Sequence, residues 1–150
     1  MKPLIIYQSR TGNTIKVAKA IASIIEAEIL SVDDATPKKL NNRTLIGFGS
    51  GIYWTCIDKK IYSLAAQLPK NNNVFIFITS GMGFNIMLRL YWYYIKSNFD
   101  RLGINLVGVW DCRGFDQHPT TKWLGLSKGH PDSTDIKNAK QFAKKMKSFC

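Results

Sequence analysis

Residues 9–14 read SRTGNT, between the apolar run PLIIY at residues 3–7 and the sequence IKVAKAIA at residues 15–22. The first run is typical of a buried strand, and the second spaces its apolar residues as an amphipathic helix does. The loop between them therefore contains three hydroxyls, an amide and a glycine. Because the backbone N–H groups at a helix N-terminus are unpaired and carry partial positive charge, this stretch predicts a phosphate-binding loop.

The residues predicted to hold the phosphate are Ser9, Arg10, Thr11, Gly12, Asn13 and Thr14. The alternative interpretation is an ordinary turn whose serine and threonine side chains cap the helix. One or two hydroxyls are enough for a cap, whereas this loop has three, with a glycine and an amide between them. The loop lacks the G-x-x-x-x-G-K-[ST] pattern of a Walker A motif, so an NTPase-type loop is not expected.

Composition and charge limit the class of protein. The chain has 150 residues, 45% of them hydrophobic, which predicts one globular domain over residues 1–150. Its net charge of +11 favours acidic or anionic partners. The three cysteines form no C-x-x-C motif and the two histidines show no neighbouring ligand cluster, so no metal is expected. No apolar run spans a membrane and no signal-peptide pattern is found, which predicts a cytoplasmic protein.

Strand-like and helix-like segments alternate along the whole chain. Such alternation predicts a doubly wound α/β fold with parallel strands buried on both faces and helices covering both faces. The predicted strands are 4–7, 28–32, 44–48, 74–79 and 105–110, and the predicted helices are 13–26, 58–68, 85–102 and 133–149, with one helical turn beginning near Thr36-Pro37.

Ligands of such sheets bind at the carboxyl ends of the strands. The segments that follow the strands are residues 9–14, 50–55, 80–84 and 111–116, and these should therefore form the site. The run GFGSG at residues 47–51 resembles part of a dinucleotide-binding fingerprint. It follows the third predicted strand rather than the first and lacks the third glycine at the required spacing, so it carries little weight.

The motif S-x-T-G-N-T after the first strand resembles the phosphate-binding loop of flavodoxins. The sequences GFGSGIYW at 47–54, ITSGMG at 78–83 and CRGFD at 112–116 also resemble segments of that family, so the similarity covers nearly the whole chain. The resemblance implies a five-stranded parallel sheet in the order 2-1-3-4-5 and FMN as the cofactor. It assigns the FMN phosphate to the loop at residues 9–14.

The resemblance also assigns the flavin ring to two later loops. Tyr53 or Trp54 would stack on the ring, and two glycines after the fourth strand would let backbone N–H groups approach its pyrimidine edge. A plain strand–helix turn is an equally good interpretation of the second loop. The cofactor-binding residues predicted in these loops are Ser50, Gly51, Ile52, Tyr53, Trp54, Thr55, Ser80, Gly81, Met82, Gly83 and Phe84.

Two functions follow from this resemblance. One is an electron carrier that serves a redox partner with an acidic docking surface. The other is a small FMN-dependent oxidoreductase of the quinone or protoporphyrinogen type, which the basic charge and the absence of a glycine after Trp54 favour. No acid–base residue stands out near the predicted ring, which weakens the hypothesis that the protein is an enzyme.

No nucleic-acid-binding motif accompanies the positive charge, so no nucleic-acid partner is expected. The aromatic run at 90–94 is expected to lie in a helix packed on both faces, and contact with a membrane surface is the alternative. The segment 117–132 is a candidate lid or partner-binding surface.

Overall fold

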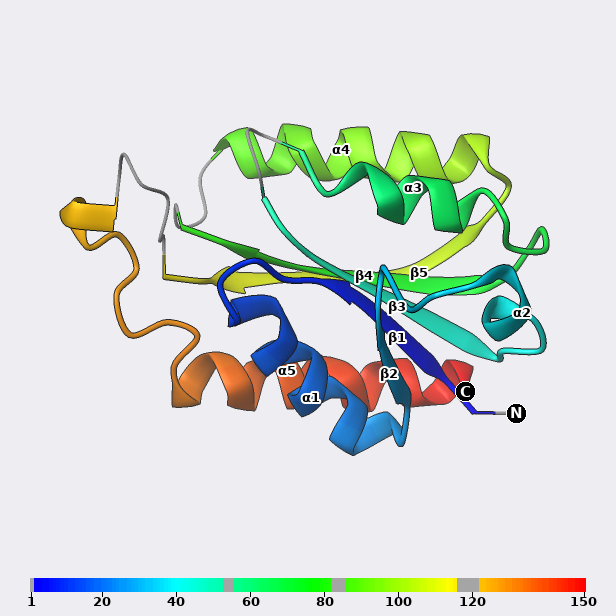
Figure 1. The fold of residues 1–150 in the computed structure, drawn as a ribbon, viewed down its shortest axis with the longest axis horizontal. Helices are drawn as coiled ribbons and strands as arrows, with labels where there is room; N and C mark the ends of the chain where they lie inside the picture. Colours follow the sequence, from blue (N-terminus) through cyan, green and yellow to red (C-terminus); the bar gives the residue numbers. More distant parts are fainter. Residues whose placement is uncertain (1, 53–55, 82–85, 116–121) are drawn as a thin grey trace.

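The computed structural model describes residues 2–52, 56–81, 86–115 and 122–150. Five strands alternate with helices, as the sequence predicts (Figure 1). The strands are β1 (Leu4–Gln8), β2 (Glu28–Ser31), β3 (Leu45–Gly51), β4 (Asn73–Ser80) and β5 (Asn105–Arg113). The helices are α1 (Asn13–Ile25), α2 (Pro37–Leu40), α3 (Lys59–Ala65), α4 (Ile86–Arg101) and α5 (Ser133–Met146), with 3₁₀ turns η1 (Lys122–Leu124) and η2 (Lys147–Phe149).

All strand pairings in the sheet are parallel, and the strand order is β2-β1-β3-β4-β5. The predicted doubly wound fold and its strand order are therefore confirmed. The order reverses at β1, which pairs with β2 on one side and with β3 on the other. In open α/β sheets the crevice at such a reversal lies at the carboxyl ends of the strands.

Each face of the sheet has its own buried cluster, covered by a pair of helices. Helices α3 and α4 cover one face, where Phe48, Ile76 and Phe99 are buried (Figure 1). Helices α1 and α5 cover the other face, where Ile5 and Phe77 are buried. Burial on both faces explains why the central strands β1, β3 and β4 are nearly continuous in apolar residues.

Four strands extend further than the sequence predicted. Strand β1 includes Gln8, β3 includes Ser50 and Gly51, β4 includes Ser80, and β5 continues to Arg113. These residues were expected in loops because small and polar side chains are typical of turns. Neighbouring strands supply the backbone hydrogen bonds that keep them in the sheet, since Ser50 pairs with Ile78 and Ser80 pairs with Arg113.

The glycines of the GFGSG run are explained by packing. An added Cβ at Gly47 would lie 2.2 Å from Cζ of Phe75, and one at Gly49 would lie 2.2 Å from Cζ of Phe77. Both phenylalanine rings therefore lie directly over the β3 backbone. The two glycines make room for these rings and do not form a nucleotide fingerprint.

Helix α4 differs from its prediction as a helix packed on both faces. Its inner side packs on the sheet through Ile95 and Phe99, which are fully buried. Leu90, Tyr93 and Tyr94 are instead exposed by 66%, 77% and 55%. Among the helices that the structure describes, none combines the length and apolar character required to cross a bilayer.

Candidate cofactor-binding site

The loop between β1 and α1 presents an open helix N-terminus. Gly12 is the N-cap residue of α1 and has a φ of 83°, a conformation that favours glycine. Its N–H donates to Ser9 Oγ at 3.1 Å, which closes the loop. No side chain caps α1 and no acidic residue lies in its first turn. The first N–H groups of α1 are thus directed at a position that favours an anion.

Side chains of the same loop hold it against the rest of the sheet. Asn13 Nδ2 donates to Thr11 Oγ1 at 3.0 Å and to the backbone oxygen of Phe115 at 2.9 Å. Thr14 Oγ1 lies 2.9 Å from Thr79 Oγ1, and both threonines are buried. The Asn13 amide and the Thr14 hydroxyl, which the sequence predicted as phosphate ligands, therefore bond within the protein. The groups of this loop that stay available to an anion are therefore backbone N–H groups.

The ends of β3 and β4 lie beside this loop and are tied to it. The N–H of Ile52 donates to the backbone oxygen of Thr79 at 3.2 Å. Ser50 Oγ donates to the Gly51 oxygen at 2.7 Å and accepts from the Asp58 N–H at 3.2 Å. Thr79 thus connects α1 with the segment after β3, because its hydroxyl contacts Thr14 and its carbonyl accepts from Ile52.

The segment after β5 packs against the same edge. The N–H of Gly114 donates to the Ser80 oxygen at 2.8 Å. An added Cβ at Gly114 would lie 3.0 Å from Asn13 Nδ2 and 3.2 Å from Thr79 Cβ, so a larger residue would push the loop away. Ser127 Oγ donates to the Gly81 oxygen at 2.8 Å, which brings part of the predicted lid segment to the end of β4.

The structure therefore brings together the described members of the predicted site from all three loops. These are Ser9, Arg10, Thr11, Gly12, Asn13, Thr14, Ser50, Gly51, Ile52, Ser80 and Gly81. The predicted residues Tyr53, Trp54, Thr55, Met82, Gly83 and Phe84 lie outside the described residues. Sequence reasoning missed Thr79 as a support of the loop, whereas Gly114 and Phe115 lie in the segment 111–116 that was predicted to contribute to the site. A threonine at the end of an otherwise apolar strand was the one available signal for Thr79.

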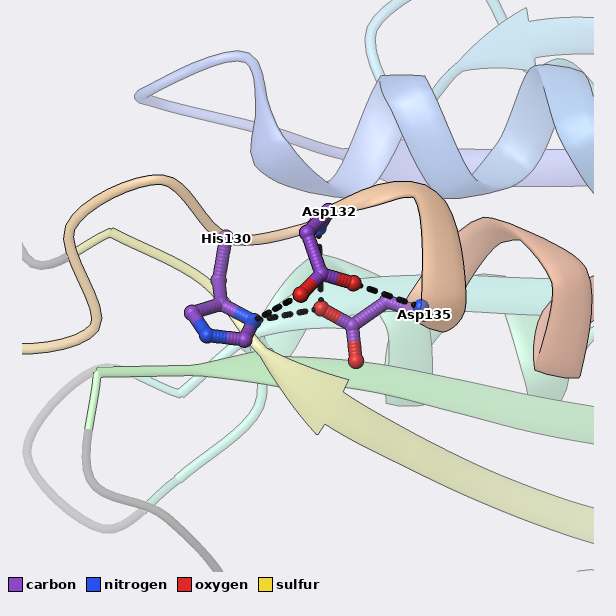
Figure 2. A group of neighbouring side chains, drawn as sticks. All are labelled: His130, Asp132 and Asp135. Atoms are coloured by element: carbon purple, nitrogen blue, oxygen red, sulfur yellow. Dashed lines mark hydrogen bonds and ion pairs between the residues drawn. The ribbon is translucent and has the colours of Figure 1, made fainter.

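A second group of polar side chains lies behind the loop, at the start of α5 (Figure 2). The N–H of Phe115 donates to the His130 oxygen, and His130 Nδ1 lies 2.6 Å from Asp135 Oδ2. Asp132 and Asp135 form a capping box, in which each carboxylate accepts from the other residue's N–H at 2.9 Å. The expectation that His130 has no carboxylate neighbours was wrong.

This group has the residue types of a metal site, with ligand-type atoms within 4.8 Å of one another. Both carboxylates are already occupied, because each accepts an N–H in the cap and Asp135 also contacts the imidazole. The hydrogen bond from the Asp135 N–H lowers the pKa of Asp132. The geometry is explained by helix capping, and it anchors the segment that carries Phe115.

This edge of the sheet carries both cations and carboxylates. Arg10, Arg113 and Lys128 are exposed there, on the β1–α1 loop, at the end of β5 and after η1. Asp111 on β5 is half-buried, and its pKa is raised by burial, although a hydrogen bond from Trp92 opposes that shift. The exposed Arg10, Arg113 and Lys128 lie at the same edge of the sheet as the open helix N-terminus, and positive charge there attracts anionic groups.

The family model for the flavodoxin domain matches residues 4–83, which include the β1–α1 loop and the ends of β3 and β4. The chain belongs to the flavodoxin family. The uncharacterized protein MJ0298 of Methanocaldococcus jannaschii is 37% identical over 147 residues, 96% of this chain and 97% of that protein. This second match covers the remaining strands and helices as well.

Solved flavodoxins share the fold. A flavodoxin from the domain Archaea has a TM-score of 0.71 at 18% identity, covering 99% of this chain and 97% of that one. Oxidised flavodoxin 1 from Bacillus cereus has a TM-score of 0.72 at 15% identity, covering 100% and 99%. Rubredoxin oxygen:oxidoreductase from Desulfovibrio gigas contains the same fold within a longer chain, with a TM-score of 0.66 at 14% identity and coverage of 98% and 35%.

Flavodoxins bind FMN, and the β1–α1 loop of this flavodoxin-type protein suits the phosphate of that cofactor. The first turn of α1 offers backbone donors without a side-chain cap or an acidic neighbour. Gly12 has open space where a Cβ would project, so a ligand can approach its backbone closely. A phosphate at such a helix N-terminus accepts several N–H groups at once.

Proposed function

We propose that residues 1–150 form one FMN-binding domain whose phosphate loop is the β1–α1 turn. Ser9, Thr11 and the backbone N–H groups of Asn13 and Thr14 hold the phosphate, and Arg10 supplies positive charge. The other cofactor-binding residues proposed are Ser50, Gly51, Ile52, Tyr53, Trp54, Thr55, Ser80, Gly81, Met82, Gly83 and Phe84. The observation that carries the proposal is the uncapped N-terminus of α1 beside Gly12 with its φ of 83°.

The protein's activity in this proposal is electron transfer. The flavin supplies the redox chemistry, and the chain binds it, orients it and shields it from water. Thr79 is central to that task, because it ties the phosphate loop to the segment that follows β3. The proposed site of action is the cytoplasm.

The proposed partner is a redox protein with an acidic docking surface. Arg10, Arg113 and Lys128 surround the proposed flavin edge, and complementary charge accelerates the encounter of two proteins. The second candidate function is a small oxidoreductase acting on an anionic quinone or porphyrinogen. The same basic groups favour it, since they would attract an anionic substrate to the ring.

Flavin titration tests the binding site. FMN is added to the apoprotein while flavin fluorescence is recorded, and riboflavin, which lacks the phosphate, is titrated in parallel. We expect FMN to bind far more tightly than riboflavin. Gly12→Ala should weaken FMN binding at least about tenfold, because alanine resists the left-handed conformation that orients the loop. Riboflavin binding should hardly change.

Gly103→Ala is the matched control. Gly103 also has a positive φ, of 70°, but it lies between α4 and β5 at the opposite end of the sheet. Its substitution should leave FMN affinity unchanged. Equal loss of FMN and riboflavin affinity in Gly12→Ala would contradict the phosphate assignment. A loaded protein that turns over quinones or porphyrinogens, and does not reduce a protein acceptor, would favour the oxidoreductase.

A further inference from the structure

Helix α4 carries a stripe of large apolar side chains that are exposed among the residues that the structure describes. At 3.6 residues per turn, Leu90, Tyr93, Tyr94 and Ser97 lie on one side of the helix. The three large side chains are exposed by 66%, 77% and 55%. Large apolar groups that cluster on an exposed helix face mark an interaction surface, whereas single ones do not.

The centre of this stripe is hollow. An open depression of about 410 Å³ is lined by Tyr93, Lys96, Ser97, Asp100 and Arg101. All five residues belong to α4, and the small Ser97 lies between larger neighbours. The face therefore combines protruding aromatic rings in the N-terminal half of the helix with a recess and charged groups in its C-terminal half.

The distribution of charge indicates which faces of the molecule can meet another copy. Helices α1 and α5 with η2 present a face that would repel a second copy, because its exposed lysines outnumber its acids, which include Glu26, paired with Lys147, and Asp132 and Asp135 at the start of α5. The exposed lysines of that face are Lys16, Lys19, Lys137, Lys140, Lys144, Lys145 and Lys147.

The described outer face of α4 has no such excess of lysines over acids. Lys96 Nζ forms an ion pair with Asp100 Oδ2 at 2.9 Å, and Arg101 lies outside that pair. An apolar, nearly charge-balanced helix face is where two copies of a chain with a net charge of +11 can approach each other.

We propose that the outer face of α4 binds a second copy of this chain, as an antiparallel helix pair with its two-fold axis at Ser97. Residues at equal distances before and after Ser97 then lie level with each other. Tyr93, four residues before the axis, meets Arg101 of the partner subunit, where the guanidinium stacks on the ring. Tyr94, three residues before the axis, lies beside Asp100 of the partner subunit, where its hydroxyl donates to the carboxylate.

Each of these contacts occurs twice, because a two-fold interface is isologous. The small side chain of Ser97 lets the two helices approach closely at the axis. The antiparallel arrangement directs the two carboxyl edges of the sheets away from each other, so both proposed flavin sites stay accessible. The dimer does not depend on FMN binding, and its test is separate from that of the proposed function.

Sedimentation velocity and light scattering of the purified protein test the proposal. Wild type should be a dimer. Tyr93→Glu together with Tyr94→Glu should raise the dimer dissociation constant by at least about a hundredfold, because two aromatic anchors are lost on each subunit. Trp123→Glu is the matched control, since Trp123 is exposed by 76% but belongs to η1, and it should leave the dimer intact.

Cross-linking tests the position of the axis. In a background in which the exposed Cys56 and Cys150 are replaced by serine, Ser97→Cys should form a disulfide between subunits on mild oxidation. Ser23→Cys, an exposed serine on α1, should not. A monomeric wild type, or a dimer that survives the tyrosine substitutions, would overturn the proposal. A dimer without the Ser97→Cys cross-link would overturn its geometry.

Discussion

The substitution Gly49→Ala tests the packing that explains the GFGSG run. The added Cβ would lie 2.2, 2.4 and 2.9 Å from Cζ, Cε2 and Cε1 of Phe77. Ordinary contact begins at 3.4 Å, so the ring must move by about 1.2 Å. Phe77 is fully buried between β4 and helices α1 and α5, where no space receives it.

The expected cost is about 3 kcal/mol of unfolding free energy, at the upper end of the range for overpacked cores. For a chain of this length that corresponds to a loss of roughly 6–12 °C in Tm. Urea unfolding followed by circular dichroism measures the free energy, and calorimetry measures the Tm. Adding Phe77→Leu should recover part of the loss, because the shorter side chain removes the clashing atoms.

Gly108→Ala, on β5, is the control. Its added Cβ would come within 2.6 Å of Met146 Sδ and 2.8 Å of Met146 Cε, atoms at the end of a flexible side chain. We expect a loss below about 1 kcal/mol, because this side chain can move aside. If Gly49→Ala is as mild as Gly108→Ala, the glycine does not serve ring packing and the reasoning fails.

Three further measurements test other contacts. Thr79→Val should lower the free energy of unfolding by about 2 kcal/mol, because it leaves the buried Thr14 hydroxyl without its partner. In urea titrations the double variant with Thr14→Val should lose less free energy than the two single substitutions added together. Asp132→Asn should lower the free energy of unfolding at neutral pH, because the Asp135 N–H holds the pKa of Asp132 below its usual 3.8. This stabilisation is lost as the pH falls below 3.8 and through the pKa of the folded state. The acid unfolding curves of the variant and the wild type should therefore converge in that range. Cys112 should resist a thiol reagent until urea unfolds the protein, because burial raises the pKa of its thiol.

Much of the fold could be predicted from local patterns. Apolar runs, nearly continuous in four of the five cases, identified all five strands, and the Thr36-Pro37 pair correctly marked the short helix α2. The errors lie at strand ends, where Ser50, Gly51 and Ser80 were placed in loops. Those residues have turn-like side chains, and only pairing with a neighbouring strand keeps them extended.

The candidate site, like the fold, could be predicted from the sequence only in part. The hydroxyl, amide and glycine residues of the SRTGNT stretch indicated a phosphate loop by their chemistry and by their position between a strand and a helix. The partners of those side chains come from distant parts of the chain, 65 residues away for Thr79 and 102 for Phe115. No local pattern identifies such contacts.

The order of apolar and polar residues was enough to determine the alternating α/β fold and to predict a loop at which an anion would bind, because hydrophobic periodicity and helix polarity act over a few neighbouring residues. Packing alone decided what the individual side chains do. It turned Asn13 and Thr14 into supports of the loop, gave Gly47 and Gly49 their role beneath two phenylalanine rings, and left one face of α4 uncovered. These outcomes depend on which segments the folded sheet brings together, and that information is spread over the whole chain.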